Sequence, residues 1–445
     1  MTAEVAILNK SAVALAADSA VTISAGSTQE KIFDSADKLF ELTNRNAIAV
    51  MVNSDMSLME APLAVLIKRY RDTAPRFSRV KEAAHDFLGY LNDFVKSSPK
   101  RIETEAIENL ARDIFNGINN RAREAWTAKV IDPSTQQVRS EYIGDTERVG
   151  QAIEAEHVHQ YEVIERAISS IDDASFYGDG KPVIATSQRA GLRALAIKHL
   201  PLASPDLIKK ALKLVETAMR KRGVGGSTTG LIIAGFGDDD LFPTLIAFEL
   251  YGTFGNRLKY AETEVVDIDR DGDKARVLPF AQREMVERFL YGLDPGIEQE
   301  ITRFARDAIP SISSQLLDAL DMSDEDRDAL MVAAEKAERA FYRGLEEKAF
   351  QSIRQVAQEE IEDMVEFMPK PEMARMAEAL VNLTSIKRRV SRGHETVGGP
   401  IDVAVISKAD GFVWVRRKHY FPAELNRRYF DRMRAACGPM PSGES

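Results

Sequence analysis

Residues 2–22 read TAEVAILNKSAVALAADSAVT, and this stretch decides the fold. Two apolar runs, at residues 5–8 and 12–17, flank the polar residues 9–11, which is the pattern of a tight antiparallel hairpin. Both runs are almost entirely apolar instead of alternating, so we expect both faces of their sheet to be covered. A sheet that is covered on both faces requires further layers of structure on each side.

After this hairpin, patterns typical of strands alternate along the chain with segments in which apolar residues recur at helical spacing. The expected strands are residues 38–42, 47–52, 229–237, 244–250, 277–280, 401–406 and 412–415. The expected helical segments are residues 77–170, 206–221, 296–368 and 372–390. This order of strands, helices, hairpin, helices and hairpin predicts an α+β fold with two sheets and helices outside them.

Thr2 is the first candidate for chemistry. Removal of an initiator methionine generally requires a small second residue, and threonine is permissive, so a mature chain would begin at Thr2. Such a residue carries a hydroxyl nucleophile and an α-amine whose pKa of about 7.7–8.0 lets it act as a base near neutrality. Taken alone, Thr2 is better explained as a permissive start residue without a chemical role, because many cytosolic proteins begin with Met-Thr.

The residues that follow Thr2 resemble the start of a mature proteasome beta subunit. They are similar as well to the peptidase subunit of the bacterial ATP-dependent two-component protease, which begins directly after its methionine. Asp18 and Thr22 match the acidic residue and the threonine that end the second strand in that family. Lys38, in the segment KLFEL, matches the lysine before the third strand, and Lys31 is a rival with a worse register.

The resemblance implies a four-layer αββα N-terminal-nucleophile (Ntn) hydrolase sandwich with large helical insertions, acting as a threonine peptidase or amidohydrolase. Thr2 would be the nucleophile, Lys38 would lower the pKa of its hydroxyl, and Asp18 would keep Lys38 charged. A backbone amide after the fourth strand would bind the oxyanion, which makes Asn53 or Ser54 the candidate. The resemblance implies no cofactor.

Later segments resemble the same family. Residues 227–252 resemble its second hairpin, and residues 398–403 resemble its glycine-rich turn and last strand pair. The resemblance covers roughly residues 2–76, 190–290 and 373–420. We therefore expect the following organisation: residues 1–76, 190–295 and 371–430 as three parts of the sandwich, residues 77–189 and 296–370 as helical insertions, and residues 431–445 as a tail.

The sequence departs from the family at several supporting positions. Asn53 and Ser54 stand where the oxyanion loop usually has glycine, and Ala20 stands where an arginine-like residue is common. The serine that supports the nucleophile is replaced by the stretch Ala281-Gln282. Because supporting residues often decide activity, the alternative is a catalytically inactive Ntn-fold scaffold or assembly protein.

Such a scaffold would form dimers or rings through helices such as 206–221 or 329–365. A third hypothesis is that the helical insertions form a partner-binding module that the sandwich presents. The active hypothesis implies a peptide or other amide as substrate, a homo-oligomer and a possible ATPase partner.

Composition narrows the class of protein. The 445 residues carry a formal net charge of −10, which argues against nucleic acid or an anionic membrane as the main partner. A single cysteine, Cys437, cannot form an internal disulfide, which fits a reducing compartment. Neither a signal peptide nor an apolar run that would span a bilayer is evident, so we expect a cytoplasmic location.

Two motifs suggest metal binding but fail on spacing. Residues 267–272 begin like a calcium loop, but the position of the closing acid falls at Leu278, so we expect a polar hairpin turn. His157 and His159 are two residues apart and would point to different faces of a helix. We expect no metal site.

Overall fold

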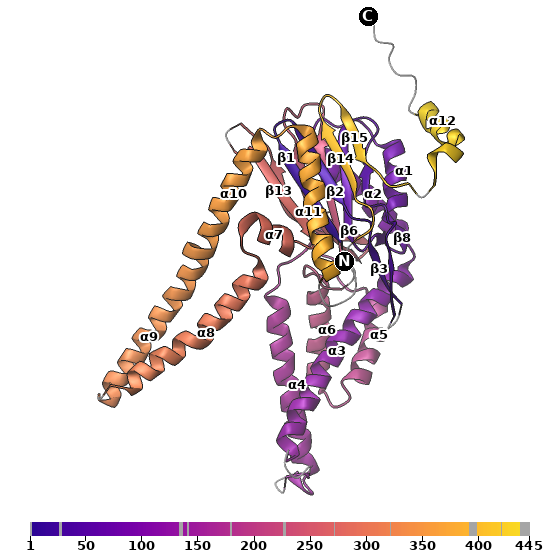
Figure 1. Ribbon diagram of the computed structural model, residues 1–445. Helices are drawn as coiled ribbons and strands as arrows, with labels where there is room; N and C mark the ends of the chain where they lie inside the picture. The colour runs from indigo at the N-terminus through magenta and orange to yellow at the C-terminus, as the bar shows by residue number, and fades with distance from the viewer. Residues whose placement is uncertain are drawn as a thin grey trace, which may run out of the picture. The chain divides into compact units, whose positions relative to one another are not determined.

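The computed structural model describes residues 2–25, 29–132, 137–139, 142–178, 180–225, 228–270, 272–320, 322–390, 398–419 and 421–436. Its fold is mixed α/β, and its sheets are antiparallel (Figure 1). The chain divides into two compact units. Unit 1 contains residues 1–39, 241–243 and 267–445, and unit 2 contains residues 40–240 and 244–266.

The sheet of unit 1 has five strands in the order β13-β1-β2-β14-β15. Their bounds are β1 Ala3–Asn9, β2 Ala12–Ala17, β13 Ala275–Ala281, β14 Asp402–Ser407 and β15 Gly411–Arg416. The expected N-terminal hairpin is confirmed, and Asn9 explains its turn. The Oδ1 atom of Asn9 accepts hydrogen bonds from the backbone N–H groups of Ser11 and Ala12 at 2.9 and 3.2 Å.

Helix α11 (Lys370–Val390) covers one face of this sheet, together with the end of α10 (Gln351–Glu366) and α7 (Glu284–Tyr291). Val5 and Ile7 of β1 pack in one buried cluster with Met373 and Leu380 of α11. The alternate residues Ala6 and Leu8, on the opposite face, are also fully buried. Uniformly apolar strands therefore do mark a sheet that is buried on both faces.

Unit 1 contains further elements that the sequence patterns did not distinguish. The hairpin of β3 (Val21–Ala25) and β4 (Gln29–Phe33) was not predicted. The expected helical stretch 296–368 consists of α8 (Pro295–Asp318), α9 (Asp324–Gly344), the π-helical turn η2 (Leu345–Phe350) and α10. The last helix is α12 (Arg427–Ala436).

The sheet of unit 2 has six strands in the order β5-β6-β10-β11-β12-β9. Their bounds are β5 Leu39–Glu41, β6 Ala47–Ser54, β9 Ser175–Phe176, β10 Thr229–Phe236, β11 Thr244–Phe254 and β12 Arg257–Asp267. The hairpin turn expected at residues 267–272 is wrong, because β12 and β13 belong to different sheets and do not pair. Asp271 itself lies outside the described residues.

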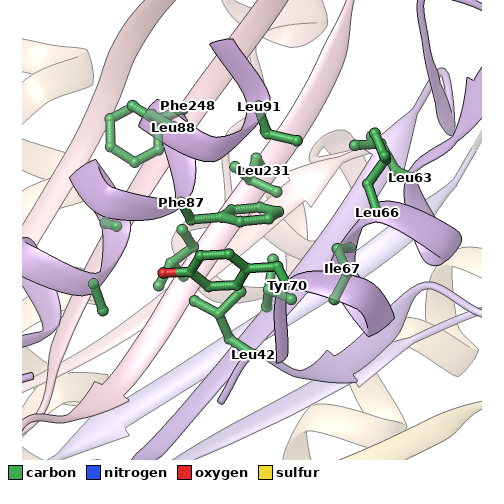
Figure 2. Packing of buried hydrophobic residues seen from close by; sticks show 14 of the residues in the cluster. Leu42, Leu63, Leu66, Ile67, Tyr70, Phe87, Leu88, Leu91, Leu231 and Phe248 are labelled. Carbon is green, nitrogen blue, oxygen red and sulfur yellow. The ribbon is translucent and has the colours of Figure 1, made fainter. Parts of the chain in front are cut away.

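Helices α1 (Leu63–Thr73) and α2 (Val80–Ser97) pack on one face of this sheet. Figure 2 shows the centre of the packing, where the rings of Tyr70 and Phe87 lie side by side in one cluster with Leu231 of β10. The centroids of these two rings are 4.8 Å apart. Although an insertion was expected to start at residue 77, α2 is therefore part of the sheet's own core.

A separate helical cluster follows in unit 2. It consists of α3 (Lys100–Val130), α4 (Thr146–Ser169), α5 (Thr186–His199) and α6 (Pro205–Met219). The expected helix 206–221 is present as α6, with Ser204 as its cap and Pro205 in its first turn. Phe254, the last residue of β11, packs into the same buried cluster, so the helices are joined to the sheet at the C-terminal end of this strand.

Neither membrane-spanning helices nor metal clusters occur in the described part of the chain. Among those residues, no helix has the length and apolarity needed to cross a bilayer. Nor does any group of three or more His, Cys, Asp or Glu residues there lie in a position to hold a metal ion. His157 lies with Nδ1 3.0 Å from the carbonyl oxygen of Ile153 and Nε2 3.1 Å from the Asn119 side chain, which is a structural role.

Lys259 of β12 is the most unusual residue in unit 2. Its side chain is fully buried, and its ammonium donates to the carbonyl oxygen of Val224 at 2.5 Å. The ring of Tyr251 lies 5.5 Å from Nζ. Burial disfavours the charged form and lowers the pKa of Lys259 to about 8.

We predict that Lys259→Met stabilises unit 2 at pH 7 and that this gain shrinks at pH 9.5. Because the pKa of Lys259 is lower in the folded than in the unfolded chain, the unfolded chain binds more protons between pH 8 and about 10.4. The penalty of the buried charge is therefore present at pH 7 and is relieved as pH rises. A gain of about 1–3 kcal/mol is expected, reduced by the lost hydrogen bond.

Urea unfolding at both pH values measures this effect. Lys209→Met, at an exposed position of α6, is the matched control, since it removes a lysine without relieving burial. Equal destabilisation by Lys259→Met at both pH values would contradict the prediction.

Candidate active site

Lys38 is the centre of a buried polar network in unit 1. Its Nζ donates to Asp18 Oδ1 at 2.6 Å, to the carbonyl oxygen of Ala20 at 2.6 Å and to Thr2 Oγ1 at 3.1 Å. A lysine ammonium has three N–H donors, and three acceptors surround this one. The side chains of Lys38 and Asp18 are exposed by only 1% and 0%. The pair is thus a fully buried and fully hydrogen-bonded charge pair.

Asp18 is held in place from three directions. Its Oδ1 accepts from the backbone N–H of Ala3 at 3.2 Å, in addition to Lys38, and its Oδ2 accepts from the N–H of Gly398 at 3.1 Å. The backbone of Asp18 donates in turn to the carbonyl oxygen of Ala3. Both carboxylate oxygens of Asp18 therefore have hydrogen-bond donors although the side chain is buried.

The position of Thr2 is set by the sheet. Ala3 pairs with Ala281 at the start of β1, and the N–H of Gln282 donates to the carbonyl oxygen of Thr2 at 3.0 Å. Thr2 is 4% exposed. Because Lys38 donates to Oγ1, the hydroxyl hydrogen of Thr2 stays available for an acceptor, and the ammonium would stabilise negative charge on Oγ1.

Lys38 contacts two other residues that the sequence singled out, Thr2 and Asp18. The structure brings Thr2, Asp18 and Lys38 into direct contact, as the resemblance implied. The rival Lys31 lies in β4 and Thr22 in β3, and both side chains lie outside the described residues. The roles of the three residues in a reaction stay predictions, since contact alone does not establish chemistry.

Asn53 and Ser54 belong to unit 2. They end β6, where they pair with Gly230 and Thr229 of β10. Ser54 has a φ of 65°, in the left-handed region, and Asn53 is buried. A Cβ atom added at Gly230 would lie 2.1 Å from Asn53 Oδ1, so glycine there leaves room for the Asn53 side chain. The oxyanion role of Asn53 or Ser54 stays a prediction.

Gln282 is a residue that sequence reasoning noted only as a departure. It follows Ala281, whose φ of 60° turns the chain at the end of β13. Its Oε1 accepts from Arg388 Nε at 2.6 Å, while its Nε2 is buried and has no hydrogen-bond partner among the described residues. The local sequence gave no sign of this arrangement, because Arg388 is 106 residues away.

Comparisons with known proteins add little. No protein-family model matches the chain, and no curated protein matches it. Among solved structures, the chain is similar to the Anbu (Gly-1) mutant from Hyphomicrobium sp. strain MC1, at 10% identity and a TM-score of 0.25, with 100% of each chain covered. A TM-score this low supports no conclusion about fold or function. Any hypothesis about function therefore rests on the residues around Thr2.

We predict that Lys38→Met and Asp18→Asn each destabilise unit 1 by about 3 kcal/mol, because each leaves a buried charge without its partner. The double variant should lose less than the sum of the two single variants, since it removes both charges together. Urea unfolding at pH 7 of all four proteins measures the coupling.

Lys10→Met is the matched control for this experiment. Lys10 pairs with Glu366 in the same unit at 2.7 Å, but its side chain is 31% exposed. Because Lys10 keeps access to water, its loss should cost less than the loss of Lys38, about 1 kcal/mol. The prediction is wrong if loss of Lys38 costs no more than loss of Lys10.

Proposed function

We propose that the chain is a proteasome-like threonine N-terminal-nucleophile amidohydrolase or peptidase, with Thr2 as its nucleophile after removal of Met1. The observation that carries this proposal is the contact of Lys38 with both Thr2 and Asp18 in a buried network. The four-layer αββα sandwich, a cytoplasmic location and an ATPase partner belong to the same proposal. The proposed substrates are peptides or other amides.

The reaction would proceed in two steps. In the first, the free α-amine of Thr2 takes the hydroxyl proton, directly or through a water molecule, and Oγ1 attacks the amide carbonyl carbon. The C–N bond breaks, the proton passes to the leaving amine, and an ester joins the acyl group to Thr2. In the second step, water attacks the ester carbonyl, the acid leaves, and the hydroxyl of Thr2 is restored.

Lys38 would act by electrostatics and would not transfer a proton. Its ammonium lies 3.1 Å from Oγ1, so it would stabilise negative charge as it develops on that oxygen. Asp18 would hold the ammonium in position, and the N–H groups of Ala3 and Gly398 would hold Asp18. Because this arrangement exists before substrate binds, no group has to reorganise during the reaction.

Gln282 would be a positioning residue. Its backbone N–H holds the carbonyl of Thr2, and Arg388 fixes its side chain through Oε1. It stands where the resemblance calls for a supporting serine. Its unpartnered Nε2 is a buried donor beside the start of β1, and a buried donor of this kind is costly unless something accepts from it.

A specific observation favours the alternative of an inactive scaffold. Ala20 and Gln282 replace two supporting residues of the resembled family, and the Nε2 of Gln282 has no partner among the described residues. In that case the network around Lys38 would only stabilise the hairpin. The two hypotheses differ in the state of the first residue and in activity.

We predict that the purified chain begins at Thr2 and cleaves members of a fluorogenic peptide-amide panel. Thr2→Ala should lower kcat/KM at least about 10³-fold, because it removes the nucleophile, whereas Thr2→Ser should retain part of the activity. Intact mass with N-terminal sequencing, followed by kinetics, measures both points.

Thr73→Ala, at an exposed position of α1, is the control for general effects of losing a threonine hydroxyl. Full activity in Thr2→Ala would contradict the mechanism in which Thr2 is the nucleophile. A chain that retains Met1 or carries an acetyl group on Thr2, and that cleaves nothing, would support the scaffold instead.

A further inference from the structure

A hollow of about 510 Å³ lies between α5 and α6, within unit 2. Its apolar wall consists of Ile184, just before α5, together with Leu192 of α5 and Leu212 of α6. Ile184 and Leu192 belong to the buried core of the helical cluster, and Leu212 packs against that core while partly exposed. Small-molecule sites in proteins have volumes of about 300–1,000 Å³ and predominantly apolar walls. The hollow therefore has the size and the wall of such a site.

The segment before α5, which forms part of this wall, is held by two arginines. Arg220, at the end of α6, donates from Nε and Nη2 to the carbonyl oxygen of Pro182 at 3.1 and 2.9 Å. Arg189 donates from Nε to the carbonyl oxygen of Ile184 at 3.3 Å. Glu216 joins the two arginines, with Oε1 2.8 Å from Arg220 Nη2 and Oε2 3.5 Å from Arg189 Nη2. The hollow thus has a wall that hydrogen bonds hold in place before any ligand binds.

Positive charge is in excess around the hollow. The lining cations are Arg189, Lys209, Lys210, Lys213 and Arg220, and the lining anions are Asp206 and Glu216. Five cations against two carboxylates leave an excess of three positive charges, although the whole chain carries a net charge of −10. Lys210 pairs with Asp206 at 3.0 Å, whereas Lys209 and Lys213 form no ion pair with any described residue. Two ammonium groups therefore stay available to an anionic ligand.

The acidic residues of α4 do not cancel this excess. Glu162 and Glu165 line a separate hollow of about 310 Å³, together with Lys210 and Lys213. Neither carboxylate forms an ion pair with either lysine among the described residues. Even when both are added to the count, five cations face four anions. Lys209 and the two arginines line only the larger hollow, so the positive charge is concentrated there.

The two unpaired lysines lie on the same side of α6. Lys209 and Lys213 are four residues apart, and side chains at this spacing are neighbours on a helix surface. Like charges at this spacing repel and destabilise the helix. An anion bound between the two ammonium groups would replace this repulsion with charge-assisted hydrogen bonds.

We propose that this hollow binds a small amphiphilic anion, in which a carboxylate or phosphate head group is joined to an apolar chain. Lys209 and Lys213 would bind the head group. Ile184, Leu192 and Leu212 would contact the chain. The proposal does not depend on the chemistry proposed for Thr2, because Thr2 belongs to unit 1 and does not line the hollow.

Other classes of small ligand fit the lining less well. An inorganic anion would leave the apolar wall uncovered, and an uncharged apolar molecule would leave the two lysines without a counter-charge. A nucleotide base is usually bound against an aromatic ring, and no aromatic side chain is among the described residues that line the hollow. Only a ligand with both an acidic and an apolar part uses the whole surface.

The first test titrates the full chain with four probes by isothermal calorimetry at low ionic strength. Decanoate and decyl phosphate combine charge with an apolar chain, whereas inorganic phosphate and decanol each carry one of the two. At least one of the two alkyl anions should bind to one site per chain. Inorganic phosphate and decanol should bind at least about tenfold more weakly, because each lacks either the burial of the chain or the charged contacts.

The two alkyl anions distinguish the source of the ligand. Binding of decyl phosphate that is tighter by about threefold or more would identify a phosphate ester, such as a lipid head group. The reverse order would identify a free fatty acid. In both cases added salt should weaken binding, because the lysines remain accessible to solvent.

The second test places the ligand in the hollow. The double variant Lys209→Gln with Lys213→Gln should raise the dissociation constant of the tighter probe about tenfold and reduce its dependence on salt. Leu212→Asn should raise it about fivefold without changing the dependence on salt, since it alters only the apolar wall. Lys198→Gln is the matched control, because Lys198 is an exposed residue of α5 that does not line the hollow. Thermal unfolding checks that each variant stays folded.

Three results would overturn the proposal. One is that neither alkyl anion binds at about 1 mM. Another is a double lysine variant that binds as tightly as the wild type, which would place the ligand elsewhere. The third is inorganic phosphate that binds as tightly as decyl phosphate, which would show that the apolar wall contributes nothing and that the lysines attract any anion.

Discussion

The buried ammonium of Lys38 is the constraint on which the organisation of unit 1 depends. A charge without access to water must have a partner for each of its donors, or the folded state is strongly destabilised. Its acceptors come from the start of β1, the end of β2 and the segment after it. Since Asp18 also binds the N–H of Gly398, the approach to β14 is held by the same charge. One cation thus links the N-terminal hairpin, the segment that follows it and the residues that lead into β14.

The parts of this structure that were predictable are those in which a local pattern has one physical solution. Two apolar runs around Asn9 can hardly form anything but a buried hairpin, and β1 and β2 are where they were expected. The contact among Thr2, Asp18 and Lys38 came from family resemblance and not from spacing, because no local pattern places residue 38 beside residue 2. The later hairpins were expected from apolar runs on either side of polar turns, and the resemblance covers the same segments.

The parts that were missed depend on partners far along the chain or on weak patterns. The β3–β4 hairpin and β12 are polar strands, and their pairing is decided by neighbours and not by alternation. Residues 267–272 look like any polar turn, and the local sequence does not say that the flanking strands enter different sheets. The contact of Gln282 with Arg388 is equally invisible in sequence. The high charge of residues 296–368 as a whole likewise concealed that α8 and α9 leave large apolar side chains such as Phe304 and Leu316 exposed.

Unit 1 combines two surfaces with opposite requirements. Around Lys38, polar groups are buried and paired by residues of the same chain, so the contact among Thr2, Lys38 and Asp18 needs nothing from a second copy. On α8 and α9, large apolar side chains such as Phe304, Leu316 and Val332 are exposed, and no residue of α9 is buried. A buried polar network whose donors and acceptors are paired within one chain needs no second chain. An apolar surface that stays exposed to solvent, in contrast, often marks a site of contact with another molecule. The interactions that would hold the nucleophile and the exposed apolar side chains of α8 and α9 therefore share no residue.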